Sequence, residues 1–173
     1  GQTDCYDADG KPIDCLATGQ DAAFAAGGYS ADRFTVLGEQ LAQDTATGLI
    51  WSRNSCPAEY PLNWQESLAY IDEMNEMAAD GRTDWRMPNR RELRSLIDHS
   101  RRKPALPIGH PFRQVFLGWY WSSTTAALAP AYAWYVHFAG GRMFYGNKDG
   151  YYWLWPVCGQ SASLAATGAD TCY

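Results

Sequence analysis

Residues 119–158 read WYWSSTTAALAPAYAWYVHFAGGRMFYGNKDGYYWLWPVC, and this stretch decides the fold class. It holds five of the chain's eight Trp and six of its eleven Tyr. Turn-forming pairs separate the aromatic runs, at Ala129-Pro130, Gly140-Gly141, Gly146-Asn147 and Asp149-Gly150. Short apolar and aromatic runs between such turns predict β-strands rather than helix. Tyr and Trp join a large apolar body to a polar tip, which favours a binding module built on a small sheet.

The segment before this stretch combines strands with two helices. Strand-like pieces at about 34–37, 40–43 and 48–52 are separated by turn residues. Asn63 with Glu66, and then Asn89 with Glu92, have the spacing of helix capping boxes. They predict a helix from about 63 to 79, ended by Gly81, and a second at about 90–98. The Pro-rich segment 99–118 is expected to be irregular, so the sequence predicts an α+β fold with mostly antiparallel pairing.

The 173 residues divide into three predicted parts. Residues 1–32 lack hydrophobic periodicity and are predicted to form a disulfide-closed arm, 33–160 the domain, and 161–173 a C-terminal tail. No apolar run reaches the length of a membrane span, and no charged-then-apolar leader starts at Gly1. We therefore expect a chain without a membrane span, either mature or trimmed.

The five cysteines, at positions 5, 15, 56, 158 and 172, lack the CxxC spacing of a zinc site. Widely spaced Cys in such a chain favour an oxidising compartment, so the expected location is secreted, extracellular or periplasmic. Cys5 and Cys15 flank a turn-rich loop that a disulfide would close. A Cys56–Cys158 disulfide would connect the beginning of the domain to its end. Cys172 is then left for an intermolecular bridge, a free thiol or another pairing.

The net charge is −5, yet eight of the 14 Lys and Arg lie between Arg82 and Lys103. This basic band is suited to anionic polymers such as sulfated glycans. The alternative, which the sequence favours, is ordinary ion pairing with the acidic helix before it. The acidic net charge argues against nucleic acid as the partner. Asp7, Asp9 and Asp14 offer calcium-type oxygen ligands, but without a closing glutamate an Asp-Gly turn is the preferred interpretation, and no metal or cofactor is expected.

No catalytic constellation stands out in the sequence. It has no nucleophile elbow, phosphate loop or isolated carboxylate pair. His137 and Asp149 are the best candidates, and His137 is more simply a strand residue. The chain is therefore expected not to be an enzyme.

Five motifs in order carry a resemblance to a known family. These are TDWRMPNRREL, YWSST, AWYVHFAGG, an isolated Lys148 and the closing WPVC. Together they resemble the C-terminal domain family of Legionella collagen-like adhesins, over about residues 1–158. That resemblance implies a C-type-lectin-like fold, related to retroelement variable proteins and to formylglycine-generating enzymes. The cysteine pair that such an enzyme needs and the calcium motifs of animal C-type lectins have no equivalent in this chain.

The resemblance also implies which residues act as scaffold and which bind a ligand. The implied scaffold residues are Trp85, Arg86, Pro88, Glu92, Leu93, Trp121, Ser122, Ser123, Trp134 and Phe138. The implied ligand-binding residues, on a C-terminal aromatic face, are Tyr145, Asn147, Asp149, Tyr151, Tyr152 and Trp153. Where the family usually has Arg, this chain has Trp155, which is expected to add another exposed aromatic. The link of these adhesins to sulfated glycosaminoglycans implies a polyanion site at Arg90, Arg91, Arg94, Arg101, Arg102 and Lys103.

Two functions follow as hypotheses. The first is a binding module that recognises a glycan or a protein surface through the aromatic face, with about half of the aromatic side chains facing inward because strands alternate. The second is a structural subunit of an envelope complex or surface fibre, a homo-oligomer or hetero-complex joined through Cys172.

Overall fold

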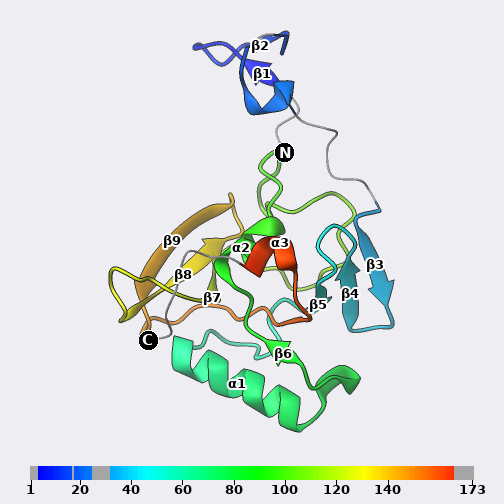
Figure 1. Ribbon diagram of the computed structural model, residues 1–173, viewed down its shortest axis with the longest axis vertical. Coiled ribbons are helices and arrows are strands. Elements are labelled where there is room, and N and C mark those ends of the chain that lie inside the picture. The colour runs from blue at the N-terminus through cyan, green and yellow to red at the C-terminus, as the bar shows by residue number, and fades with distance from the viewer. Residues whose placement is uncertain (1–3, 17, 25–31, 166–173) are drawn as a thin grey trace.

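The computed structural model describes residues 4–16, 18–24 and 32–165, and it has the predicted α+β class. Two antiparallel sheets form the body of the fold (Figure 1). The larger sheet contains, in spatial order, β3 (Phe34–Leu37), β4 (Leu41–Asp44), β5 (Ile50–Ser52), β10 (Val157–Cys158) and β6 (Trp85–Arg86). The smaller sheet contains β7 (Trp119–Thr125), β8 (Tyr132–His137) and β9 (Arg142–Asn147), in that order. The aromatic stretch therefore forms strands, as its turn residues predict.

The last strand of the domain lies in the middle of the larger sheet. In β10, Val157 pairs with Trp51 of β5 on one side and with Arg86 of β6 on the other. The expectation that the first and last strands of the domain are neighbours is wrong, because β10 does not pair with β3. The neighbour of β10 is the third strand of the opening set, because β3 lies at the sheet edge and β4 lies between β3 and β5.

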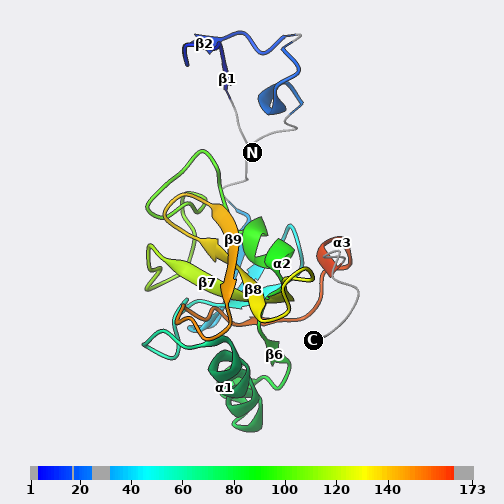
Figure 2. The same cartoon turned by 90° about the vertical axis from the view of Figure 1, so that its left-hand side faces the viewer.

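The first predicted helix is α1 (Trp64–Glu76). Both bonds of its capping box form: the Asn63 side chain accepts from the Glu66 N–H at 2.8 Å, and the Glu66 carboxylate accepts from the Asn63 N–H at 2.9 Å. The helix ends before the predicted residue 79 because Ala78 adopts a left-handed conformation, with φ of 47°. The 3-10 turn η2 (Ala79–Gly81) follows. Figures 1 and 2 show α1 along the lower edge of the body, apart from α2.

The second predicted helix is α2 (Arg90–Ser95), which also begins with a complete capping box. Leu93, Leu96 and Ile97 are buried, as their spacing predicts, although the helix is shorter than 90–98. The short helix α3 (Ala162–Ala165) packs on α2, and the Asn89 side-chain amide donates to the Leu164 carbonyl at 3.0 Å. Among the described residues, no helix is long and apolar enough to span a membrane.

The turn between β8 and β9 packs closely against the end of α2. Gly141 has a φ of 71°, and a Cβ added there would lie 2.5 Å from Ile97 Cγ2. A side chain at this position would strain the backbone and collide with the core. Glycine therefore permits the smaller sheet to approach α2.

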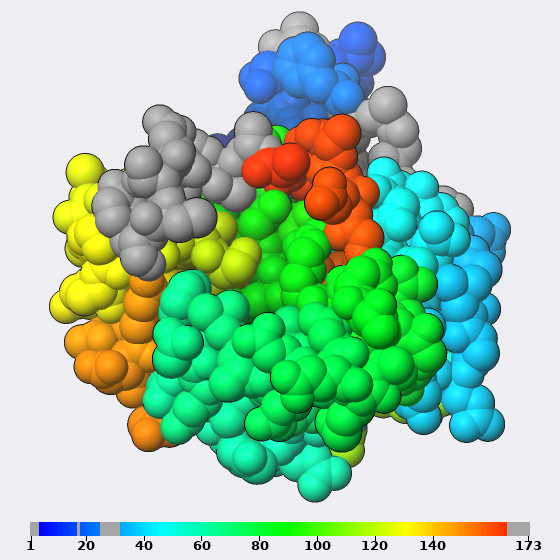
Figure 3. All heavy atoms as spheres, turned by 60° about the horizontal axis from the view of Figure 1, so that its bottom comes forward, coloured from blue at the N-terminus to red at the C-terminus, as the bar shows by residue number. Residues whose placement is uncertain are grey.

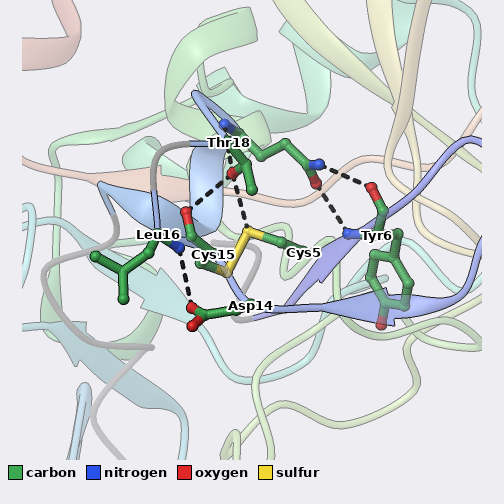
Figure 4. Close-up of a disulfide and its surroundings, with 7 residues drawn as sticks. Cys5, Tyr6, Asp14, Cys15, Leu16 and Thr18 are labelled. Atoms are coloured by element: carbon green, nitrogen blue, oxygen red, sulfur yellow. Dashed lines mark hydrogen bonds between the residues drawn. A yellow bond between two sulfur atoms is a disulfide. The ribbon is translucent and has the colours of Figure 1, made fainter.

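The arm consists of β1 (Cys5–Tyr6), β2 (Pro12–Ile13) and the 3-10 turn η1 (Asp21–Ala23). The predicted Cys5–Cys15 disulfide is present (Figure 4). The Thr18 hydroxyl donates to the Cys15 carbonyl at 3.0 Å and secures the loop beside it. Covalent closure compensates for a segment with little apolar core of its own.

Asp7 forms the turn that the sequence favours over a calcium loop. Its Oδ1 accepts from the backbone N–H groups of Asp9 and Lys11, at 3.0 and 2.8 Å. An Asp side chain that binds its own backbone in this way stabilises a turn.

Two aromatic-rich clusters form the core. The first centres on Trp155 and includes Trp51, Leu93 and Phe138, and the second centres on Trp121 beneath α1. The sheets, α1 and α2 all contribute to these clusters, so the core fixes where the surface aromatics can lie.

One ion pair is buried at the edge of the larger sheet. Arg33 binds Asp44 through two hydrogen bonds, at 2.9 and 2.6 Å, and also donates to the Ser95 carbonyl at 2.9 Å. The two side chains are only 4% and 0% exposed. The pair ties β4 to the end of α2, and loss of one partner would leave a buried charge uncompensated.

We expect Arg33→Met to lower the free energy of unfolding by roughly 3–5 kcal/mol, because Asp44 would stay buried and unpaired. Urea denaturation followed by circular dichroism measures this. The control is Arg82→Gln, which breaks the partly exposed Arg82–Asp84 pair and should cost at most about 1 kcal/mol. Equal losses in the two variants would contradict a special role for the buried pair.

Candidate functional site

Strand alternation distributes the predicted ligand-binding residues over different surfaces. Tyr145 lies directly opposite Trp134 in the β8–β9 pairing, so the two side chains share a face of the smaller sheet. Their rings are 5.1 Å apart in an edge-to-face arrangement. Asn147 lies on the same face, opposite Tyr132. Tyr145 is 38% exposed, which leaves part of its ring available to a ligand.

Asn147 and Asp149 belong to the turn that follows β9. The Asn147 side-chain oxygen accepts from the Asp149 N–H at 3.0 Å, so this amide holds the turn. The Asp149 side chain is exposed. Lys148, between them, points inward: its Nζ donates to Thr125 Oγ1 at 3.0 Å and lies 4.2 Å from the centre of the Trp64 ring. Desolvation lowers the pKa of Lys148.

The next three aromatic residues face in different directions. Tyr152 pairs with Leu62 and packs edge-on to Trp121 at 4.7 Å, in the second core cluster. Trp153 stacks on Phe116, with ring centres 3.9 Å apart. Tyr151 is 63% exposed and faces α1. Tyr145 and Tyr151 therefore belong to two separate surfaces.

The expectation that Trp155 is an exposed aromatic is wrong, because its side chain is fully buried. Its indole N–H donates to the Ser52 carbonyl at 2.9 Å, and its ring contacts Phe112, Tyr120 and Phe138. Trp155 lies two positions before β10, which is in the middle of the larger sheet, so core residues surround its side chain. Trp155 is a core residue and is removed from the candidate site.

A cavity of about 200 Å³ opens beside the half-buried Trp134 and the exposed Tyr145. We call it the Trp134 cavity. Arg90 of α2, Thr124 and Thr125 of β7, and the loop 126–129 complete its walls. The Arg90 guanidinium lies 4.6 Å from the centre of the Trp134 ring, a cation–π distance. A mostly apolar cavity with a few polar groups is typical of a small-ligand site.

Hydrogen bonding fixes the position of Arg90 at this cavity. Its backbone N–H donates to Thr124 Oγ1 at 3.0 Å, which attaches the first turn of α2 to β7. The Arg90 side chain is half-buried against Trp134. Sequence reasoning missed this contact and the Thr124–Ala129 wall, because neither follows from helical spacing.

The rest of the basic band is exposed. The other predicted polyanion residues are Arg91, Arg94, Arg101, Arg102 and Lys103, and all five are exposed. Two arginines of the band form ion pairs, Arg82 with Asp84 and Arg86 with Glu92. Neither carboxylate belongs to α1, so the expected pairing with the acidic helix is wrong for these two. Within the described residues, Arg94, Arg101, Arg102 and Lys103 also form no ion pair.

The proposed Cys56–Cys158 disulfide is also wrong, since both cysteines are buried free thiols. Cys56 lies 3.4 Å from the Tyr120 hydroxyl in the first core cluster, whereas Cys158 lies in the second. Burial raises the pKa of Cys56, and it raises the pKa of Cys158 to about 12. Cys172 lies outside the described residues. Within those residues, no group of three or more His, Cys, Asp or Glu could hold a metal ion.

The fold and the Trp134 cavity define the chain as a small α+β domain with an aromatic, partly basic surface. The model of the Lcl C-terminal domain family matches residues 40–158, more than half of the chain. The chain therefore belongs to this family, and the membership indicates an adhesin-like surface module. No curated protein matches the chain.

We expect Cys56 and Cys158 to resist alkylation in the folded protein and to react fully in denaturant without a reductant, because both are buried, protonated thiols. Peptide mass spectrometry after iodoacetamide treatment measures this. Cys5 and Cys15 are the internal control and should react only after reduction. Protection of Cys56 and Cys158 in denaturant would reveal a disulfide and contradict the structure.

Proposed function

We propose that the chain is a secreted or periplasmic, non-enzymatic module that binds a glycan, with sulfated sugars as the preferred class. The observation that carries this proposal is the Arg90 guanidinium above the Trp134 ring. This contact connects the aromatic face of the smaller sheet to the part of the basic band that lies on α2. One ligand can then contact both an aromatic ring and a cationic surface.

The mechanism is stacking combined with charge. The apolar face of a sugar ring packs on the exposed part of Tyr145, at the mouth of the Trp134 cavity. A sulfate on that ring or on the next one reaches Arg90 or the exposed Arg94, since a guanidinium matches the geometry of oxyanions. The more distant Arg101, Arg102 and Lys103 then add long-range attraction for a longer chain.

Location and class have separate support. The Cys5–Cys15 disulfide is of the kind that persists in an oxidising compartment, which supports secretion. The proposal also holds that the chain is not an enzyme. Cys56 lies close to the Tyr120 hydroxyl, but burial raises its pKa. A catalytic thiol needs a lowered pKa. The C-type-lectin-like fold also stays a prediction. The exposed Tyr145 near the end of the domain is consistent with it.

We expect Tyr145→Ala to weaken binding to heparin by roughly 2- to 10-fold, the effect of losing one aromatic contact. Isothermal titration calorimetry measures the affinity, with hyaluronan as an anionic but unsulfated polymer and dextran as a neutral one. The matched control is Tyr151→Ala, another exposed tyrosine outside the Trp134 cavity. Equal losses in both variants would contradict this location, and no binding of any polymer would contradict the glycan proposal.

The charge component has its own test. We expect the triple variant Arg94→Gln, Arg101→Gln and Arg102→Gln to bind heparin more weakly and with a flatter dependence on salt, because fewer counterions are exchanged. Affinity measured from low to high NaCl gives both quantities. The wild type at high salt is the reference, and the difference between the two proteins should shrink there. An unchanged salt slope would remove the basic band from the site.

A further inference from the structure

A second cavity, of about 360 Å³, lies between α1, the loop before it and the segment that follows β9. We call it the tyrosine cleft. Three tyrosines line it, Tyr60, Tyr70 and Tyr151, together with Glu66 and Glu73 of α1. Small apolar residues complete the lining. In Figure 3, β9 and the residues that follow it (orange) lie beside α1 (teal).

The helix supplies one wall of the cleft as a continuous stripe. Glu66, Tyr70 and Glu73 are spaced four and three residues apart, so they project from one face of α1. The other face carries Ile71 and Met74 into the core. The stripe therefore faces the cleft while the helix stays anchored.

Backbone pairing fixes the opposite wall. Leu62 and Tyr152 exchange two hydrogen bonds, at 2.9 and 3.0 Å. Because neighbouring residues of an extended segment project in opposite directions, the inward packing of Tyr152 turns Tyr151 outward into the cleft. Tyr60, two residues before Leu62, lines the same cleft, and the two tyrosines are 61% and 63% exposed. Both tyrosines are fixed in position by the backbone around them, and their side chains stay accessible to a ligand.

The charge of the cleft is negative, and none of the described residues that line it is Lys, Arg or His. The Glu73 carboxylate makes no hydrogen bond or ion pair within the described residues. Glu66 uses Oε2 for the capping box of α1. Burial and the nearby Tyr60, Glu73 and Glu59 raise the pKa of Tyr70, in agreement with a negative local field.

We propose that the tyrosine cleft binds an organic ammonium cation, such as the trimethylammonium group of a choline headgroup or the side-chain ammonium of a lysine. Aromatic faces attract such cations through the ring quadrupole, and carboxylates beside the rings add Coulomb attraction. The same chain already places Lys148 Nζ 4.2 Å from the centre of the Trp64 ring, so its own packing uses this interaction. A bare metal ion would instead require several converging oxygen ligands.

The charge of the ligand is tested by comparing choline with 3,3-dimethylbutanol, its neutral isostere, in calorimetric titrations of the full chain. We expect saturable choline binding, with the isostere at least about 10-fold weaker, because only the cation gains from the quadrupole and the carboxylates. Nα-acetyl-lysine amide is the second cation, and preference for one of the two identifies the source. Equal binding of the isostere, or no binding of either cation up to roughly 10 mM, would overturn the proposal.

Variants then locate the site. Tyr60→Ala, Tyr151→Ala and Glu73→Gln should each weaken binding of the preferred cation by roughly 2- to 30-fold. Glu76→Gln is the matched control, since it removes the same charge from the same helix but lies outside the cleft, and it should change affinity less than about 2-fold. An equal loss in Glu76→Gln would reduce the effect to general electrostatics and overturn the site.

The tyrosine cleft and the Trp134 cavity are tested independently. Tyr145→Ala should leave cation binding unchanged, just as Tyr151→Ala should leave heparin binding unchanged. Circular dichroism of each variant checks folding, which exposed side chains should tolerate. Loss of cation binding in Tyr145→Ala would contradict a separate site.

Discussion

The structure depends on the burial of Trp155. Its ring contacts Trp51, Phe112, Tyr120 and Phe138, which come from β5, the irregular segment 99–118, β7 and the residue after β8. Four distant parts of the chain therefore meet at one side chain, which also holds a backbone carbonyl of β5 through its indole N–H. With Trp155 in place, β10 enters the larger sheet between β5 and β6, and the two sheets are fixed relative to each other.

That arrangement determines which aromatic side chains remain at the surface. Because β10 is central, the segment leading into it must pass beside β7, where the Trp121 backbone N–H donates to the Trp153 carbonyl. Tyr152 turns inward there and Tyr151 outward. Tyr145, on the edge strand β9, faces α2 instead. One aromatic-rich stretch thus supplies two surfaces of different charge, a basic one at α2 and an acidic one at α1.

Local patterns were sufficient for much of the fold. The Asn63 and Asn89 capping boxes form as their spacing requires, because each is completed within four residues of the chain. The aromatic stretch forms strands, because its turn residues leave no room for a helix. The position of Arg90 over Trp134 could not be predicted, since it depends on how α2 packs against β7 and β8.

The sequence by itself determined the class of the fold, the capped helices, the arm disulfide and the resemblance to the Lcl C-terminal domain family. These features depend on neighbours in the chain or on short motifs, whose chemistry is local. Only the tertiary structure decided that Trp155 is core, that Cys56 and Cys158 lie apart as thiols, and that Tyr145 and Tyr151 face different cavities. The physical reason is that exposure and pairing depend on which segments pack together, and that packing brings together residues far apart in the chain.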